Sequence, residues 1–103
     1  MLDAYIYGGR RSAFGRNAGA LALIRPDDLL GQVMKEVVDE SPFSADSIED
    51  VHVGCANQAG EDSRCVARHA ALLAGLPVEV PGTVLQRNCG SGLNAIITAA
   101  HAI

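Results

Sequence analysis

One cysteine in this chain has the surroundings of a nucleophile. Cys89 lies in the string QRNCGSGLN, between an apolar run, Thr83–Leu85, and residues 93–100, where apolar side chains recur at helical spacing. A thiol at a strand-to-helix turn meets unpaired backbone N–H groups and the positive end of the helix dipole, and both favour the thiolate. Gly90 and Gly92 leave room for a substrate to approach the sulfur. The pattern therefore predicts covalent catalysis through Cys89.

A cysteine nucleophile needs a base, and the chain offers three histidines. His52 falls within a short β-like run, and His69 falls in the middle of a helical segment. His101 lies about 18 Å along the helix that Cys89 begins, at 1.5 Å per residue. None of the three is expected to serve Cys89 as a base.

A metal site is one alternative use of these side chains. Cys65 and His69 are four residues apart on an expected helix, and Cys55 lies nearby in sequence. The chain has no C-x-x-C pair, however, and a tetrahedral site needs a fourth ligand. We therefore expect no metal and ordinary packing for these residues.

Phosphate binding is another alternative. Gly8-Gly9 follows a β-like run, but neither G-x-G-x-x-G nor G-K-[ST] comes after it. The arginines near the N-terminus could meet the phosphates of a nucleotide-like ligand, yet their spread favours a solvated surface or contacts with another subunit. They are Arg10, Arg11, Arg16 and Arg25.

The elements that must position Cys89 alternate between strand and helix. The predicted order is β-α-β-α-β-α, which indicates an α/β fold with a mostly parallel sheet and helices packed on it. Asp62 or Ser63 is expected to cap the second helix, and Gly75 to end it in a left-handed conformation. Ahead of Thr83–Leu85 and the last helix, the expected elements are a strand at Ala4–Gly8, a helix at Pro26–Asp39, a strand within Asp50–Gly54 and a helix at Ser63–Ala74.

Composition narrows the class of protein. A chain of 103 residues makes at most one small domain. Its net charge is −4 and its basic residues are scattered, so we expect no nucleic-acid partner. No apolar stretch approaches the ~18–20 residues of a membrane helix, and no basic-then-apolar leader begins the chain, so we expect no membrane association. Three irregularly spaced cysteines argue against a disulfide framework and predict a cytoplasmic location.

Three segments together resemble the thiolases, the enzymes that cleave or form 3-oxoacyl-CoA thioesters. They are AYIYGGRRSAFGR, GCANQAGEDSRCVARHAALLAGLPVEVPG and QRNCGSGLNA, and the longest of them is especially similar to the subgroup acting on 3-oxoadipyl-CoA. The resemblance covers nearly the whole chain and implies that residues 1–103 are the N-terminal part of a thiolase-like N-terminal domain, with a partial thiolase-like fold.

The resemblance also implies a mechanism. Cys89 would carry the acyl group, acyl-CoA would be the substrate and CoA the co-substrate, with no metal or redox cofactor. Thiolases form homodimers or homotetramers. The family's catalytic histidine, in a Gly-His-Pro segment, and its other catalytic cysteine, in a Cys-x-Gly segment, have no counterpart in residues 1–103. We therefore expect these residues alone to be inactive, and which of them contact CoA is not predicted.

Two other functions stay open at this stage. A condensing enzyme of the 3-oxoacyl synthase type uses a similar cysteine with two histidines, and a non-catalytic remnant or interaction module would keep the sheet without the chemistry. Sequence beyond Ile103 discriminates among them. Gly-His-Pro with Cys-x-Gly indicates a thiolase, and two spaced histidines without the additional cysteine indicate a synthase.

Overall fold

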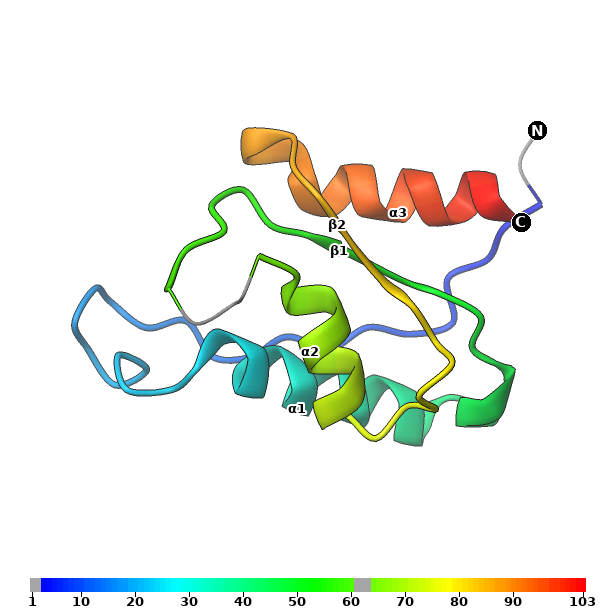
Figure 1. Cartoon of the computed structure of the whole chain (residues 1–103), viewed down its shortest axis with the longest axis horizontal. Coiled ribbons are helices and arrows are strands. Elements are labelled where there is room, and N and C mark those ends of the chain that lie inside the picture. The colour runs from blue at the N-terminus through cyan, green and yellow to red at the C-terminus, as the bar shows by residue number, and fades with distance from the viewer. Residues whose placement is uncertain (1–2, 61–63) are drawn as a thin grey trace.

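The computed structural model describes residues 3–60 and 64–103 (Figure 1). Short strands alternate with helices after a long N-terminal segment without regular structure. In chain order the elements are helix α1 (Pro26–Glu40), the 3-10 turn η1 (Ala45–Ser47), strand β1 (Val51–Gly54), helix α2 (Val66–Leu73), strand β2 (Gly82–Leu85), the 3-10 turn η3 (Asn88–Gly90) and helix α3 (Ser91–Ala102).

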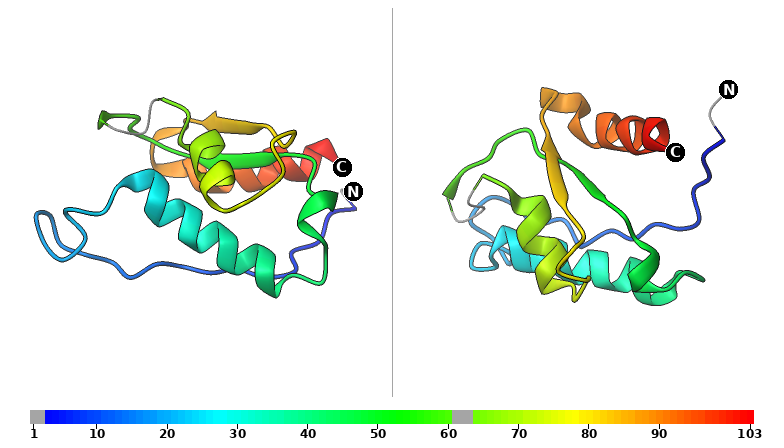
Figure 2. Two further views of the ribbon diagram at one scale, coloured as in Figure 1. Left: turned by 60° about the horizontal axis from the view of Figure 1, so that its bottom comes forward. Right: turned by 45° about the vertical axis from the view of Figure 1, so that its right-hand side comes forward.

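The two strands form a parallel pair between layers of helix. Val51 pairs with Gly82 at one end of the register and Gly54 with Leu85 at the other. Helix α3 packs on one face of the pair, whereas α2 packs on the other face with α1 beneath it (Figures 1 and 2). The α/β class, the parallel pairing and the packing of helices on the sheet are confirmed.

The prediction of a strand at Ala4–Gly8 is wrong. The segment is extended but has no strand partner among the described residues, whose only sheet is the pair β1-β2. Within it, the Tyr7 ring meets the Phe43 ring edge-on with centroids 4.7 Å apart, and just after it Arg10 pairs with Glu40 at the end of α1. Aromatic and β-branched residues favour an extended backbone, but only a neighbouring strand makes that backbone part of a sheet.

The two expected helices before β2 are confirmed, with shifted bounds. Helix α1 starts at Pro26, as predicted, and runs one residue longer, to Glu40. Helix α2 starts at Val66 with Cys65 as its N-cap, later than expected. The caps predicted at residues 62 and 63 lie outside the described residues. Gly75 has a φ of 83°, which confirms the left-handed end.

Small residues build the core, because the elements approach one another closely. Ala67, Ala70 and Ala71 of α2 are almost completely buried. A Cβ atom on Gly31 of α1 would lie 3.1 Å from the Cβ of Leu73, so α1 and α2 touch nearly backbone to backbone. Around Ala71 the core continues into larger residues, which are Leu76, Val80, Met34, Val38, Ile48 and Val51.

Helix α3 turns its small residues to the sheet and its large ones away. Ser91 and Ala95 are buried, whereas Leu93 and Ile96 are more than half exposed and Ile97 is 41% exposed. The apolar spacing that predicted this helix therefore marks a face that nothing in the described residues covers. No helix in residues 3–60 or 64–103 is long and apolar enough to cross a bilayer.

Two glycines allow helices to rest directly on the strands. A Cβ atom on Gly54, at the end of β1, would lie 2.3 Å from the carbonyl carbon of Ser91. A Cβ atom on Gly82, at the start of β2, would lie 2.5 Å from the backbone nitrogen of Arg68 in α2. Backbone atoms cannot move aside as a flexible side chain can, so a methyl group at either position would force the layers apart.

The close approach at Gly82 predicts a difference between two glycine-to-alanine changes. Gly82→Ala is expected to lower the free energy of unfolding by about 1–3 kcal/mol through overpacking. Gly92→Ala is the control, because a Cβ atom there meets nothing within 4 Å and the residue is helical. It is expected to leave the free energy of unfolding unchanged or to raise it by less than the ~0.5–1 kcal/mol found for glycine in the middle of a helix, because Gly92 lies in the first turn of α3. Urea unfolding measures both, and equal stability of the two variants would contradict the packing argument.

An ion pair at the start of α1 predicts a pH dependence of stability. Arg25 donates two hydrogen bonds to the buried Asp27 carboxylate, 3.2 and 3.1 Å long. They lower the pKa of Asp27 below its ordinary value of 3.8, despite the opposing effect of burial. A lowered folded-state pKa means that this contribution is fully present above about pH 4 and is lost as the pH falls further.

We therefore expect Asp27→Asn to destabilise the protein most at neutral pH, and the difference from the unchanged protein to shrink toward about pH 2. Asp39→Asn removes an exposed ion pair with Lys35 and is the control, with a smaller effect at neutral pH. Chemical unfolding at several pH values tests this. A pH-independent effect of Asp27→Asn would show that the carboxylate charge does not stabilise the fold.

Candidate active site

Cys89 lies where the sequence places it, at the turn between a strand and a helix. It is the middle residue of η3, four residues after β2 ends and two before α3 begins. Its side chain is exposed, whereas Cys55 and Cys65 are half-buried. The Gly90 N–H donates to the Arg87 carbonyl across 2.8 Å, which closes the turn on which Cys89 stands.

A left-handed residue precedes Cys89. Asn88 has a φ of 42°, a conformation that few residues other than glycine adopt and that asparagine tolerates best. It turns the chain sharply out of β2, so that the next residue projects from the surface. The sequence patterns above do not predict this conformation, although asparagine directly before a Cys-Gly pair is a signal for it.

The segment that follows β1 lies beside the turn and braces it. The Cys55 N–H donates to the Leu85 carbonyl across 3.0 Å, which continues the strand pairing by one residue. The Gln86 side-chain amide then donates to the Ala56 carbonyl across 2.8 Å. Pairing thus continues beyond both strands on the approach to Cys89.

The histidines do not join the site. His101 lies in the last turn of α3, and His69 belongs to α2 on the other side of the sheet. His52 is half-buried in β1, with its Nε2 3.4 Å from an Asp50 carboxylate oxygen. Within the described residues no hydrogen bond or ion pair links Cys89 to a histidine.

The residues weighed for metal binding have other roles. Cys65 caps α2, and its Sγ–H donates to the Gly82 carbonyl across 3.4 Å, which ties α2 to β2. In the part of the chain that the structure describes, no group of three or more His, Cys, Asp or Glu side chains could hold a metal ion.

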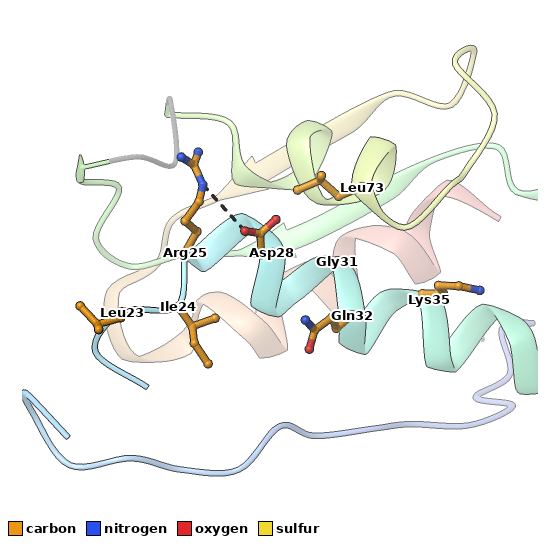
Figure 3. A pocket seen from close by; sticks show the side chains of 8 residues that line it. All are labelled: Leu23, Ile24, Arg25, Asp28, Gly31, Gln32, Lys35 and Leu73. Carbon is orange, nitrogen blue, oxygen red and sulfur yellow. Dashed lines mark ion pairs between the residues drawn. The ribbon is translucent and has the colours of Figure 1, made fainter. Parts of the chain in front are cut away.

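The N-terminal arginines are scattered, and several already have partners. Arg10 pairs with Glu40, and the Arg11 guanidinium lies 4.8 Å from the centre of the Phe14 ring. Arg25 also borders a hollow at the start of α1, where it faces Asp28 at 3.9 Å (Figure 3). The lining of this hollow contains no residue of η3 or α3, so it is separate from the cysteine turn; it consists of Leu23, Ile24, Arg25, Asp28, Gly31, Gln32, Lys35 and Leu73.

One protein family matches nearly the whole chain. Residues 4–103 match the sequence model described as thiolase, N-terminal domain. A Bacillus anthracis acetyl-CoA acetyltransferase structure matches with a TM-score of 0.75 and 36% identity, over 81% of this chain and 21% of that one.

Curated relatives agree over the full chain. The chain is 52% identical to the 3-oxoadipyl-CoA/3-oxo-5,6-dehydrosuberyl-CoA thiolase of Escherichia coli and to a beta-ketoadipyl-CoA thiolase of Acinetobacter baylyi, covering 100% of this chain and 26% of each relative. A steroid 3-ketoacyl-CoA thiolase of Mycobacterium tuberculosis is 38% identical, over 100% of this chain and 25% of that relative. The chain therefore spans about a quarter of the length of these relatives.

The exposure of the three cysteines predicts an order of reactivity. With iodoacetamide under native conditions, we expect Cys89 to be alkylated first, because it alone is exposed, and Cys65 last, because its Sγ is hydrogen-bonded. Peptide mapping by mass spectrometry gives the three rates separately. The same reaction in urea is the control, where the three rates should converge. Faster native labelling of Cys55 or Cys65 would contradict the geometry of the turn.

Proposed function

Because the chain belongs to the thiolase family, we propose that residues 1–103 supply the nucleophile of a 3-oxoacyl-CoA thiolase and that Cys89 carries the acyl group. The observation that supports this most directly is the exposed sulfur on the turn between β2 and α3. A covalent intermediate there divides one difficult reaction into two easier ones.

In the proposed first step, the Cys89 thiolate attacks the 3-oxo carbon of a 3-oxoacyl-CoA. The bond between the second and third carbons breaks, its electron pair leaves with the acetyl-CoA part, and a proton completes acetyl-CoA. The remaining acyl group stays on the sulfur as a thioester. In the next step the thiol of free CoA attacks this thioester, and the Cys89 thiolate is released with a shortened acyl-CoA as product.

A backbone N–H at Cys89 can stabilise the negative charge that develops on the acyl oxygen. The Gly90 N–H is occupied by the Arg87 carbonyl, and within the described residues the Cys89 N–H has no acceptor. An uncommitted N–H at a helix start is a suitable donor to an oxyanion. Because no histidine among the described residues is bonded to Cys89, we propose that the proton transfers use groups outside residues 1–103 and that this part alone is inactive.

The substrate class follows from the relatives. Those with 52% identity are named for 3-oxoadipyl-CoA or beta-ketoadipyl-CoA, so we propose as substrate a 3-oxoacyl-CoA whose acyl chain ends in a free carboxylate. CoA is the co-substrate, and the mechanism requires neither a metal nor a redox cofactor. We further propose a cytoplasmic enzyme that acts as a homodimer or homotetramer, without a nucleic-acid or membrane partner.

Succinyl-CoA, the shortened acyl-CoA expected from 3-oxoadipyl-CoA, tests the function, because the reverse of the second step acylates the same sulfur. The intact enzyme containing these residues is mixed with succinyl-CoA, quenched in acid and mapped by mass spectrometry. We expect the succinyl group on Cys89, and Cys89→Ser should reduce thiolysis of 3-oxoadipyl-CoA to background. Cys55→Ser is the control and should keep thiolysis within about a factor of three, because Cys55 takes no part in the chemistry. A succinyl group on Cys55 or Cys65 instead would overturn the proposal.

A further inference from the structure

The first residue of α3 is buried although it is polar. Ser91 is 5% exposed and stands two residues after Cys89. A buried hydroxyl at this position must be hydrogen-bonded, because an unsatisfied polar group inside a protein is costly.

The Ser91 hydroxyl is hydrogen-bonded in both directions, and both partners lie on the far side of Cys89. It accepts from the Arg87 N–H across 2.9 Å and donates to the Asn88 carbonyl across 2.8 Å. The Ser91 N–H also donates to the Asn88 carbonyl. One side chain therefore closes a loop of five residues with Cys89 near its middle.

This loop contains the left-handed backbone at Asn88, which needs such support. A non-glycine residue with positive φ persists only where neighbouring contacts hold it. The two hydrogen bonds of the Ser91 hydroxyl attach to Asn88 itself and to the residue before it. Without them the chain is free to relax toward an ordinary turn, which would swing Cys89 away from the start of α3.

Strand β1 holds the other side of Ser91. The missing side chain of Gly54 lets the β1 backbone lie against the Ser91 and Gly92 peptides, where a Cβ atom would be 2.3–2.4 Å from their atoms. Ser91 is therefore seated against the sheet while its hydroxyl holds the turn. The contact with β1 therefore fixes where Ser91, and with it the turn that carries Cys89, lies relative to the strands.

We propose that Ser91 is a positioning residue for Cys89: it holds the Cys89 sulfur and backbone N–H at the N-terminus of α3 without touching the substrate. The part of this proposal that concerns acyl transfer rests on the proposed thiolase function. The part that concerns the thiol does not, because alkylation of Cys89 needs no enzyme activity.

The first test measures iodoacetamide alkylation of all three cysteines in the Ser91→Ala variant. We expect Cys89 to react roughly two- to fivefold more slowly, since it loses its alignment with the helix dipole, while Cys55 and Cys65 keep their rates. Ser47→Ala is the matched control, because the Ser47 hydroxyl donates to the carbonyl three residues earlier, just as Ser91 does, but in η1. It should leave Cys89 unchanged.

A further pair of variants separates the effect of the hydroxyl from the effect of side-chain shape. The side chains in Ser91→Thr and Ser91→Val have nearly the same shape, but threonine keeps the hydroxyl and valine has a methyl group in its place. In Ser91→Thr, Cys89 should be alkylated at close to its rate in the unchanged protein. In Ser91→Val, Cys89 should be alkylated about as slowly as in Ser91→Ala. Equal Cys89 rates in the two variants would overturn the proposal. So would faster labelling of all three cysteines in both Ser91→Ala and Ser91→Val, because that pattern shows general unfolding.

Thiolysis by the intact enzyme completes the test. Ser91→Ala should lower kcat with KM within a factor of about two, and Ser91→Thr should restore kcat, because a positioning residue acts on the reacting sulfur rather than on substrate binding. An increase in KM alone would overturn the proposal. If succinyl-CoA never labels Cys89 but Ser91→Ala still slows its alkylation, the thiolase function fails and the positioning role stands.

Discussion

The contact between the end of β1 and the start of α3 is the constraint on which the cysteine turn depends. Gly54 has no side chain, so the strand backbone reaches the backbone of Ser91 and Gly92. Helix α3 is then held against the sheet at the end where Cys89 stands. A helix that begins on a sheet edge presents its unpaired N–H groups in a fixed direction, which a loop on the surface cannot do.

The rest of the chain supports this contact through small residues. Alanines of α2 and Gly31 of α1 bring two helices close beneath the strands, and Cys65 and Arg68 tie α2 to the chain that leads into β2. Arg68 donates to the carbonyls of Val80 and Val78 across 2.6 and 2.9 Å. Cys89 therefore stands on a thin but closely packed support, while much apolar surface on α3 stays exposed.

Large apolar side chains lie exposed on α3. The chain spans about a quarter of the length of its relatives, and Leu93 and Ile96 are more than half exposed among the described residues. A globular protein seldom leaves large apolar side chains grouped on one helix without a partner surface.

Local sequence determined the helices, the two paired strands, the left-handed Gly75 and the turn at Cys89, because each depends on spacing, caps or backbone preference within a few residues. Only the tertiary structure decided that Ala4–Gly8 is not a strand, since an extended segment becomes a strand only when another backbone lies beside it. It also decided the roles of Gly54 and Ser91. Their contact joins residues far apart in the chain, and it brings β1 against Ser91, whose hydroxyl bonds Arg87 and Asn88.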